Sequence, residues 1–406
     1  MRHLSSLLLG IFFSLGSSLE AQKIFNVADL SDFESYLKTE IDSGQIAGAE
    51  VLIYHDQKTV WHKALGYNNV QTKAALEKNS IYFIQSMTKP IMSVAIMQLI
   101  EKGLLSLDDL AEDYLPELAD LRVIEDVTKG IDGPTVAAKQ PINIKHLLTH
   151  TAGLSHGLGE HLFDQQLFKL MYNDLFDPAV YEKLEEPVAK LLQVPLIGQP
   201  GEQWYYSAAP DILALILQKI TQQPINEYLE QHIFQPLEMS ETAYNVTTEN
   251  LDRVMQVHLN TEKGDLVHSH VQARTNGNTV YGGTYGLFSS TEDYLNFCQM
   301  LLNKGSYKGK QILSEASVLQ MTKNHVGEMM GPSRGFGLGF GVLFDTDKDP
   351  SPANTGQIYW GGFFKTHFFI DPTEDLIALF MTQKIPNTNE YIIALNRAVY
   401  AALEEN

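Results

Sequence analysis

A serine and a lysine stand three residues apart in Ser86-Met87-Thr88-Lys89, and on a helix this spacing places both side chains on one face. A serine hydroxyl is a weak nucleophile until a base or a cation lowers the cost of losing its proton, and a lysine one turn away can do this. Pro90 fits only the first turn of a helix or a kink, so Ser86 is expected at a helix N-terminus, where backbone N–H groups favour an anion. The spacing alone is common, and on its own it favours solvated or structural side chains over a catalytic pair.

A second serine, Ser155, lies in a G-x-S-x-G pattern between Gly153 and Gly157. This pattern marks a nucleophile elbow when an apolar strand precedes it and a helix follows it. Residues 144–150 have helical spacing instead. The pattern therefore favours a glycine-rich turn.

Histidines gather in the same part of the chain, at His146, His150, His156 and His161. The first two are four residues apart, a spacing that can bind a metal on a helix. No acidic ligand is placed beside them, so we expect no metal site. Cys298 is the single cysteine, which excludes an intramolecular disulfide, and its apolar helical surroundings indicate a core residue.

Two aromatic segments could line a ligand site. In residues 204–208, Tyr206 precedes an expected helix and could project its phenol from a loop, although three aromatic residues in a row are typical of packing. In residues 359–363, Gly361 and Gly362 indicate either close approach of another group or a β-bulge. The chain has neither a phosphate-binding loop nor a dinucleotide fingerprint.

The elements that must position these motifs change in type along the chain. A capping box at 31–34 predicts a helix that ends at Gly44, and β-like runs at 49–54 and 59–65 predict a hairpin. Further helices are predicted over 87–102, 143–150, 208–221 after an N-cap at Ser207, 290–304 and 391–403, and strands over 340–344, 357–360, 363–370 and 376–382. This order predicts an α+β fold: an antiparallel sheet flanked by N- and C-terminal helices, with a helical insert. The α/β part would comprise about 22–85 and 270–406, and the helical part about 86–269.

Composition and charge limit the kinds of partner and the cellular location that can be expected for the protein. The chain has 406 residues, 44% of them apolar, so it can bury a large core. Its formal net charge of −20 argues against nucleic acid, whose affinity comes mainly from Lys and Arg. Arg2 and His3 precede an apolar run over 7–15, and Ala21 fits the last residue before cleavage, which predicts a signal peptide over 1–21. We therefore expect a secreted or periplasmic protein with no integral membrane segment after cleavage.

Three motifs in register resemble those of the serine β-lactamase-related family, which includes class C β-lactamases and penicillin-binding-protein-like proteins. Residues 86–89 resemble its S-x-x-K motif, and 206–208 stand where the family has Tyr-Ser-Asn or Tyr-x-Asn. Residues 360–362 stand where lactamases have Lys-Thr-Gly and related esterases have Trp-Gly-Gly. Supporting segments lie at 147–154, 286–297 and 369–372. Several motifs in order are far more specific than any one of them.

The resemblance implies a β-lactamase/transpeptidase-like fold and an acyl-enzyme mechanism. Ser86 would attack a carbonyl, and Lys89 and Tyr206 would share the role of base, with the lysine charge holding the phenol near ionisation. Backbone N–H groups of Ser86 and Phe363 would form the oxyanion hole. Water would then release the acid. No metal or cofactor is implied.

The chain departs from the family pattern at two positions. Ala208 replaces an asparagine that would orient the acyl side chain and Lys89. Trp360 replaces a lysine that would supply charge near a substrate carboxylate, and it offers a broad apolar wall instead. Ala208, Trp360, Gly361 and Gly362 are the expected substrate-binding residues.

These departures favour an exported serine hydrolase that cleaves small or uncharged carboxylic esters. Two alternatives stay open: a D-amino-acid peptidase, amidase or weak β-lactamase acting on peptidoglycan-like substrates, and a non-catalytic binding module of the same fold. In every case the expected partner is a small molecule, an ester or an amide for the enzymes, and the sequence sets no oligomeric state. Lys365 and His367 follow the Trp-Gly-Gly segment, but the sequence does not place them in the pocket.

Overall fold

An eight-stranded antiparallel sheet organises the protein, in the order β13-β14-β15-β16-β17-β2-β3-β4. The computed structural model describes residues 23–172, 181–386 and 388–404, so the expected signal peptide lies outside the described residues. The strands of this sheet are β2 Gly48–His55, β3 Lys58–Asn69, β4 Ala74–Ala75, β13 Arg334–Phe336, β14 Gly341–Leu343, β15 Ile358–Gly361, β16 His367–Asp371 and β17 Leu376–Met381. Segments from both halves of the chain therefore build one sheet, with β17 paired to β2.

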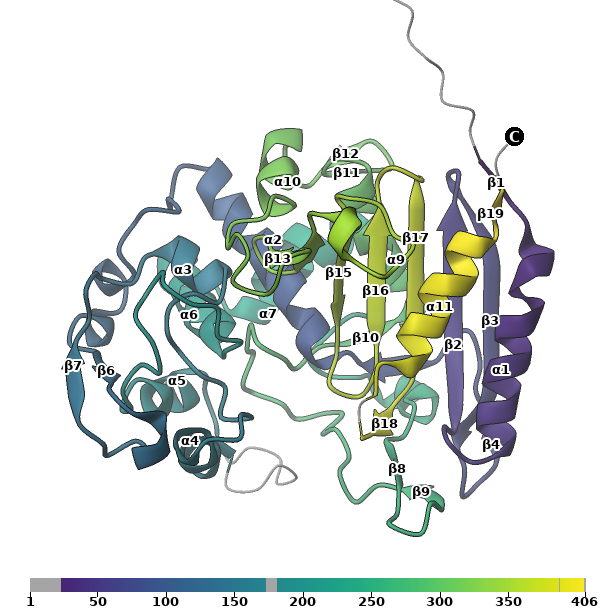
Figure 1. Ribbon diagram of the computed structural model, residues 1–406, viewed down its shortest axis with the longest axis horizontal. Helices are drawn as coiled ribbons and strands as arrows, with labels where there is room; N and C mark the ends of the chain where they lie inside the picture. The colour runs from purple at the N-terminus through teal and green to yellow at the C-terminus, as the bar shows by residue number, and fades with distance from the viewer. Residues whose placement is uncertain (1–22, 173–180, 387, 405–406) are drawn as a thin grey trace, which may run out of the picture.

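Helices cover both faces of the sheet. The N-terminal helix α1 (Ser31–Asp42) and the C-terminal helix α11 (Glu390–Ala401) lie together on one face, and α9 (Thr291–Leu302) packs on the other (Figure 1). Strand β17 shows how the sequence satisfies both layers. Its alternate residues Leu376, Ala378 and Phe380 belong to the core under α1 and α11, whereas the residues between them join the main core. A strand buried on both faces carries a continuous apolar run, as this one does.

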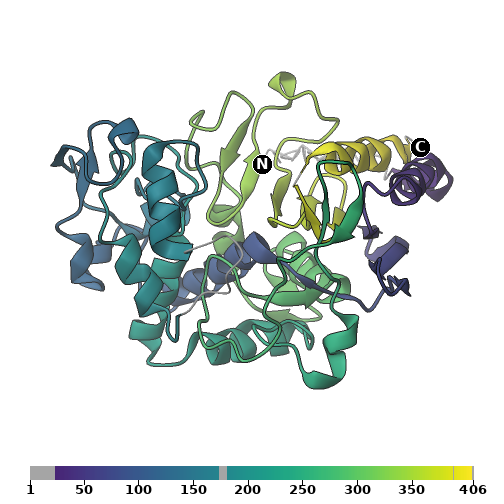
Figure 2. The ribbon, with the colours of Figure 1, turned by 90° about the horizontal axis from the view of Figure 1, so that it is seen from below.

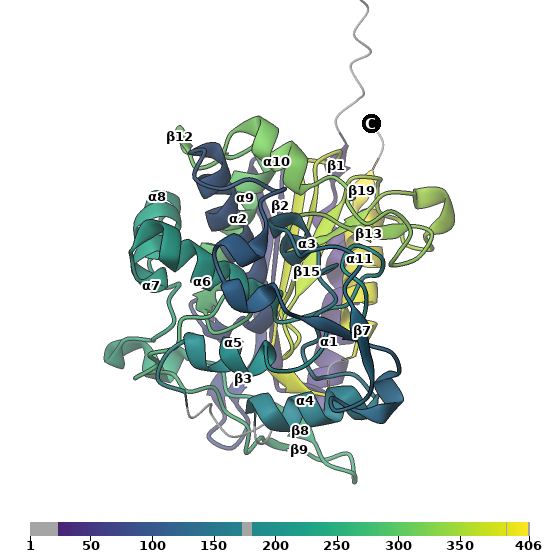
Figure 3. The ribbon, with the colours of Figure 1, turned by 90° about the vertical axis from the view of Figure 1, so that its left-hand side faces the viewer.

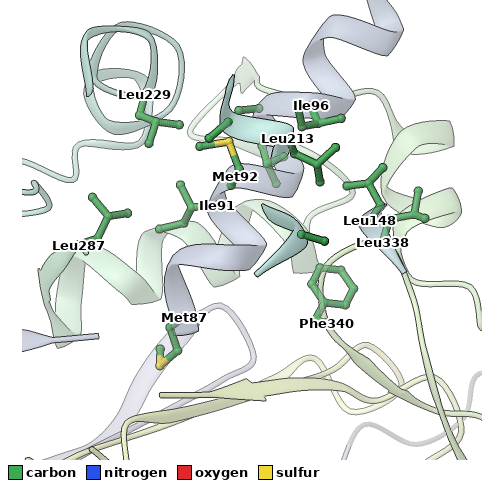
Figure 4. Packing of buried hydrophobic residues seen from close by; sticks show 14 of the residues in the cluster. Met87, Ile91, Met92, Ile96, Leu148, Leu213, Leu229, Leu287, Leu338 and Phe340 are labelled. Carbon is green, nitrogen blue, oxygen red and sulfur yellow. The ribbon is translucent and has the colours of Figure 1, made fainter. Parts of the chain in front are cut away.

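A helical region stands beside the sheet. Its helices are α2 Thr88–Glu101, α3 Ile144–Leu148, α4 Leu162–Tyr172, α5 Glu185–Leu191, α6 Ala209–Thr221, α7 Ile225–Leu229, α8 Gln235–Leu237 and α10 Glu315–Met321. Viewed from below, α2 lies between the other helices of this region and the sheet (Figure 2). From the helical side, α3 and α5 stand in front of the sheet (Figure 3). Met87, Ile91, Met92 and Ile96 from the α2 segment pack with Leu213 of α6 in the main core (Figure 4).

Short strands complete the molecule. They form small sheets from β1 Ile24–Phe25 and β19 Leu403–Glu404, β5 Ile81–Phe83 and β10 Phe288–Ser290, β6 Arg122–Ile124 and β7 Thr135–Ala137, β11 Ser306–Tyr307 and β12 Lys310–Gln311, and β8 His258–Asn260 with β9 Leu266–His268 and β18 Lys384–Ile385. No helix within the described ranges is long and apolar enough to cross a membrane. The β10–β5 pair leads directly into the segment that carries Ser86.

The structure confirms the predicted fold class, and it moves several element boundaries. The hairpin between β2 and β3 turns at Asp56 and Gln57, which both have positive φ. Helix α1 is preceded by a 3₁₀ turn, so its N-cap is Leu30 and the expected capping box at 31–34 is absent. The N-cap of α6 is Ala208 rather than Ser207, although the Ser207 hydroxyl still accepts from the Ala209 N–H. Strand β16 begins at His367, because 363–366 form a turn.

Candidate active site

Ser86 lies in a single 3₁₀ turn, Gln85–Met87, that runs into α2. Gln85, the residue before Ser86, has a φ of 49°, a left-handed conformation that is uncommon for a residue with a side chain. The turn is fixed from both sides. The Ile84 N–H donates to the Leu287 carbonyl at 3.0 Å, and the Tyr294 hydroxyl donates to the Met87 carbonyl at 2.9 Å. Ser86 is therefore held at the start of a buried helix, as its spacing to Lys89 and Pro90 predicts.

Two side chains converge on the Ser86 hydroxyl. Lys89 Nζ lies 3.1 Å from Ser86 Oγ, and the Tyr206 phenol donates to the same oxygen at 2.7 Å. The Lys89 ammonium also lies over the Tyr206 ring, 4.6 Å from its centroid. Three residues that are up to 120 positions apart thus form one hydrogen-bonded cluster, which is the arrangement of a serine activated by an adjacent base.

Lys89 is buried, with 1% of its surface exposed. Its amine donates to the Thr284 carbonyl at 2.9 Å, while the Thr284 N–H donates to Asp211 Oδ1 at 2.8 Å. Burial lowers the pKa of Lys89 to about 7, and the negative charge of Asp211 opposes this shift. A lysine whose pKa lies this low exchanges its proton near neutral pH, which is what a general base requires.

Tyr206 sits among aromatic rings that fix its orientation. His150 and His156 each meet its ring edge-on at a centroid distance of 5.0 Å, and Trp360 lies at 5.5 Å. Burial raises the pKa of Tyr206, opposed by the hydrogen bond to Ser86 and by the indole N–H of Trp360. The resting phenol is therefore protonated. The expectation that the lysine charge holds it near ionisation is wrong, because both groups are buried and burial favours the neutral form of each.

The predicted oxyanion hole lies where the turn after β15 meets the segment before Ser86. A Cβ on Gly362 would stand 2.5 Å from the Ile84 carbonyl oxygen, so only glycine allows this approach. The Thr366 hydroxyl donates to the same Ile84 carbonyl at 3.4 Å. These contacts hold Phe363 and Ser86 on adjoining segments of one cavity wall, where both residues line the cavity.

A cavity of about 590 Å³ opens over this cluster. Of the residues expected from the sequence, the structure brings together Ser86, Lys89, Tyr206, Trp360, Gly361, Gly362 and Phe363 along its wall. Ala208 is the exception. It is fully buried outside the cavity lining, and its carbonyl accepts from the Thr284 hydroxyl at 3.3 Å.

The second serine motif is structural. Ser155 is 4% exposed, lies outside the cavity lining, donates to Asp164 Oδ1 at 2.5 Å and accepts from the Gly157 N–H. Gly153 and Gly157 have positive φ, which explains the glycines of the pattern. No strand precedes this loop, which follows α3. Within the described ranges, no cluster of His, Cys, Asp and Glu could hold a metal ion.

Two functional residues escaped sequence reasoning, Asp211 and Thr284. Asp211 lies in the first turn of α6, three residues after Ala208, and therefore on the same helix face. Its carboxylate lines the cavity and supports Lys89 through Thr284, next to the position where the family has an asparagine amide. The sequence signal for Asp211 is its position: it supplies a carboxyl group one helical turn after Ala208, where the family's asparagine amide is missing.

Comparisons with known proteins identify the family of the chain. A family model described as Beta-lactamase matches residues 33–402. Protein Rv1367c of Mycobacterium tuberculosis is 29% identical over 378 residues, which cover 88% of this chain and 91% of that protein. Lovastatin esterase of Penicillium rubens is 28% identical over 391 residues, 87% of this chain and 92% of that protein.

The fold has close counterparts among solved structures. The structure of EstCE1, described as a hydrolase with promiscuous acyltransferase activity, aligns with a TM-score of 0.80 and 24% identity over 92% of this chain and 99% of that chain. That likeness establishes the fold, while the family match spans almost all of the described chain. The chain therefore belongs to the beta-lactamase family of serine-dependent enzymes and their relatives, among which are esterases.

Proposed function

We propose that the protein is a carboxylic-ester hydrolase that forms an acyl-enzyme on Ser86. The observation that carries this proposal is the pair of contacts to Ser86 Oγ, from Lys89 at 3.1 Å and from Tyr206 at 2.7 Å. A serine with a low-pKa amine on one side and a phenol on the other has both a proton acceptor and a proton donor within reach. The similarity to lovastatin esterase supports an ester as the substrate.

The chemistry follows from the hydrogen bonds. In the resting protein, Tyr206 and Lys89 both donate to Ser86 Oγ, and Lys89 also donates to the Thr284 carbonyl. Once Lys89 is the neutral amine, its lone pair can turn to the Ser86 hydroxyl and accept that proton. As Ser86 Oγ bonds to the ester carbon, its proton passes to Lys89 and the carbonyl oxygen becomes an oxyanion facing the Ser86 and Phe363 N–H groups.

Collapse of that intermediate breaks the bond to the alcohol oxygen. The leaving alkoxide takes the Tyr206 proton, and Lys89 returns a proton to the phenol, over which its ammonium lies. Water then attacks the acyl-enzyme by the reverse path and releases the acid. Each proton has a named donor and acceptor, so the cycle needs only the ester and water.

The cavity wall supports an ester that carries an apolar group. Trp360 stands where lactamases carry a lysine, and its indole N–H is buried without a hydrogen-bond partner at proper geometry among the described residues. Aromatic and aliphatic side chains dominate the rest of the lining, including Phe83, Phe168, Tyr172, Leu184 and Val280. Such a wall accepts an apolar acyl or alcohol group through burial of its surface.

The test is to incubate the protein with a fluorophosphonate and to map the labelled peptide by mass spectrometry. We expect the label on Ser86, and we expect turnover of a short-chain nitrophenyl ester to exceed that of a chromogenic cephalosporin and a D-alanyl amide. Faster turnover of the amide would support a peptidase instead. A folded protein that takes no label and turns over none of the three would be a binding module.

We also propose that the protein is exported, because residues 1–21 have the charge and apolar pattern of a signal peptide. Expression of the full chain followed by N-terminal sequencing of the protein outside the inner membrane should give Gln22 as the first residue. An uncleaved chain retained in the cytoplasm would contradict this.

A further inference from the structure

Lys365 is a second buried lysine at the cavity. It lies in the turn between β15 and β16, two residues after Phe363, and only 4% of its surface is exposed. Its φ of 74° is left-handed, a conformation that costs a residue with a side chain and that glycine or asparagine adopts more easily. The turn nevertheless carries a lysine here, and the residue lines the same cavity as Ser86.

The ammonium of Lys365 makes few polar contacts among the described residues. It donates to Asn389 Oδ1 at 2.8 Å, and Asn389 also lines the cavity. Among the described residues it makes no ion pair with a carboxylate; the nearest acidic influence is that of Glu390, which raises its pKa against the larger effect of burial. A buried cation is costly unless an anion balances it.

Among the described residues that line the cavity, the charged side chains are Lys89, Asp211, Arg274 and Lys365. The net charge of the chain is −20, yet Arg274 and Lys365 give this described part of the lining two cations even when Lys89 is the neutral base. Asp211 already acts on Lys89, at the serine end. Among the described lining residues, Lys365 and Arg274 are left as cations without a carboxylate of their own.

The histidines of the cavity do not change this balance. Burial lowers the pKa of His156 to about 4 and that of His367 to about 3, so both rings are neutral at physiological pH. Lys365 stands two residues before His367, and its charge adds to the effect of burial in lowering the pKa of that ring. The positive region therefore lies around the turn that follows the oxyanion residue Phe363.

We propose that Lys365 recognises a carboxylate on the substrate, so that the natural esters of this enzyme are esters that also carry a free carboxylate. The proposal rests on the proposed ester hydrolysis and specifies its substrate class. Trp360 on β15 stands where lactamases have a lysine, so that cation is absent here. Lys365, in the turn after β15, would provide a cation in its place. The carboxylate would take the free N–H groups of the ammonium while the apolar wall holds the rest of the molecule.

The experiment compares matched esters that differ only in charge. One pair carries the charge on the acyl side, 4-nitrophenyl hydrogen glutarate and its methyl ester, and the other on the leaving group, 4-acetoxybenzoate and methyl 4-acetoxybenzoate. The readout is the ratio of kcat/KM between acid and methyl ester within each variant, which is independent of the fraction of active protein. The variants are Lys365→Met, Lys365→Arg and, as a control, Lys139→Met, which removes an exposed cation outside the cavity.

We expect the wild-type ratio to favour the acid in at least one pair, to fall about tenfold in Lys365→Met, and to persist in Lys365→Arg and Lys139→Met. Equal ratios in wild type and Lys365→Met for both pairs would overturn the proposal while leaving ester hydrolysis intact. Calorimetric binding of the same pairs to Ser86→Ala gives the comparison without turnover. There too, an acid that binds no more tightly than its methyl ester in either pair would overturn the proposal, whatever becomes of the proposed activity.

Discussion

Ser86 and Ser155 both lie in motifs typical of nucleophiles, but the hydrogen bonds at their hydroxyl groups run in opposite directions. Ser86 accepts hydrogen bonds from Lys89 and Tyr206 and lines the cavity. Ser155 donates its own proton to the Asp164 carboxylate and is closed off from that cavity. The comparison teaches that a motif provides the residue type, whereas the direction of the hydrogen bonds and access to a cavity decide whether its oxygen can attack a substrate.

The largest expected effect is on Ser86. Because the Ser86→Ala variant lacks the attacking oxygen, kcat/KM for a nitrophenyl ester should fall by about 10⁴-fold or more. The variant leaves the Lys89 amine and the Tyr206 phenol without this acceptor, so the free energy of unfolding should fall by at most about 1–3 kcal/mol and the protein should stay folded. The fluorophosphonate label should also disappear. Loss of activity in Ser155→Ala, with Ser86→Ala still active, would reverse the assignment of the two serines.

Tyr206→Phe tests the donor side of the cluster. The variant keeps the ring that His150 and His156 hold but removes the proton for the leaving group, so kcat should fall by about 10²- to 10³-fold. The loss should shrink for esters whose alcohol is a good leaving group, because these need less protonation. The control is Tyr205→Phe, whose phenol lies outside the cavity lining. Equal losses for good and poor leaving groups would contradict the role as proton donor.

Asp211→Asn tests the charge that supports Lys89. Above its pKa of about 7, Lys89 is the neutral amine that accepts the serine proton, so kcat/KM should rise with pH through this value. Asp211 raises the pKa of Lys89, and its removal should shift the acid limb to lower pH, by about one unit.

Asparagine retains an oxygen for the Thr284 N–H, so the variant removes the charge and keeps the contact. Asp164→Asn is the matched control, a buried carboxylate outside the cavity that should leave the profile in place. An unchanged or upward shift in Asp211→Asn would show that Lys89 is not the titrating base.

The sequence predicted the cluster of Ser86, Lys89 and Tyr206 only through several family-like motifs in register, because the Ser-Lys spacing alone is common and the Tyr206 segment alone is typical of packing. It was insufficient for Lys365, since the strand pattern over 363–370 conceals a left-handed turn, and only that turn brings the lysine to the cavity. Asp211 was missed for a different reason. Its partner Thr284 is 73 residues away, so no local pattern joins them.

The smallest expected effect completes the comparison of the two serines. Ser155→Ala leaves Asp164 without its donor and the Gly157 N–H without its acceptor, both in buried positions. A buried polar group without a partner costs about 1–3 kcal/mol, so the free energy of unfolding measured in urea should fall by about that amount. The kcat/KM for the ester should stay near the wild-type value, because neither Ser155 nor Asp164 lines the cavity.

Ser155→Cys and Asp164→Asn separate the two halves of that contact. The cysteine offers a weaker donor in nearly the same place, and its stability should lie between those of wild type and Ser155→Ala. If Ser155→Ala were as stable as wild type but slower, the loop would be acting through its neighbour His156, which lines the cavity and packs on Tyr206. If Ser155→Ala lowers the free energy of unfolding but leaves kcat/KM unchanged, Ser155 has a structural role and Ser86 remains the nucleophile.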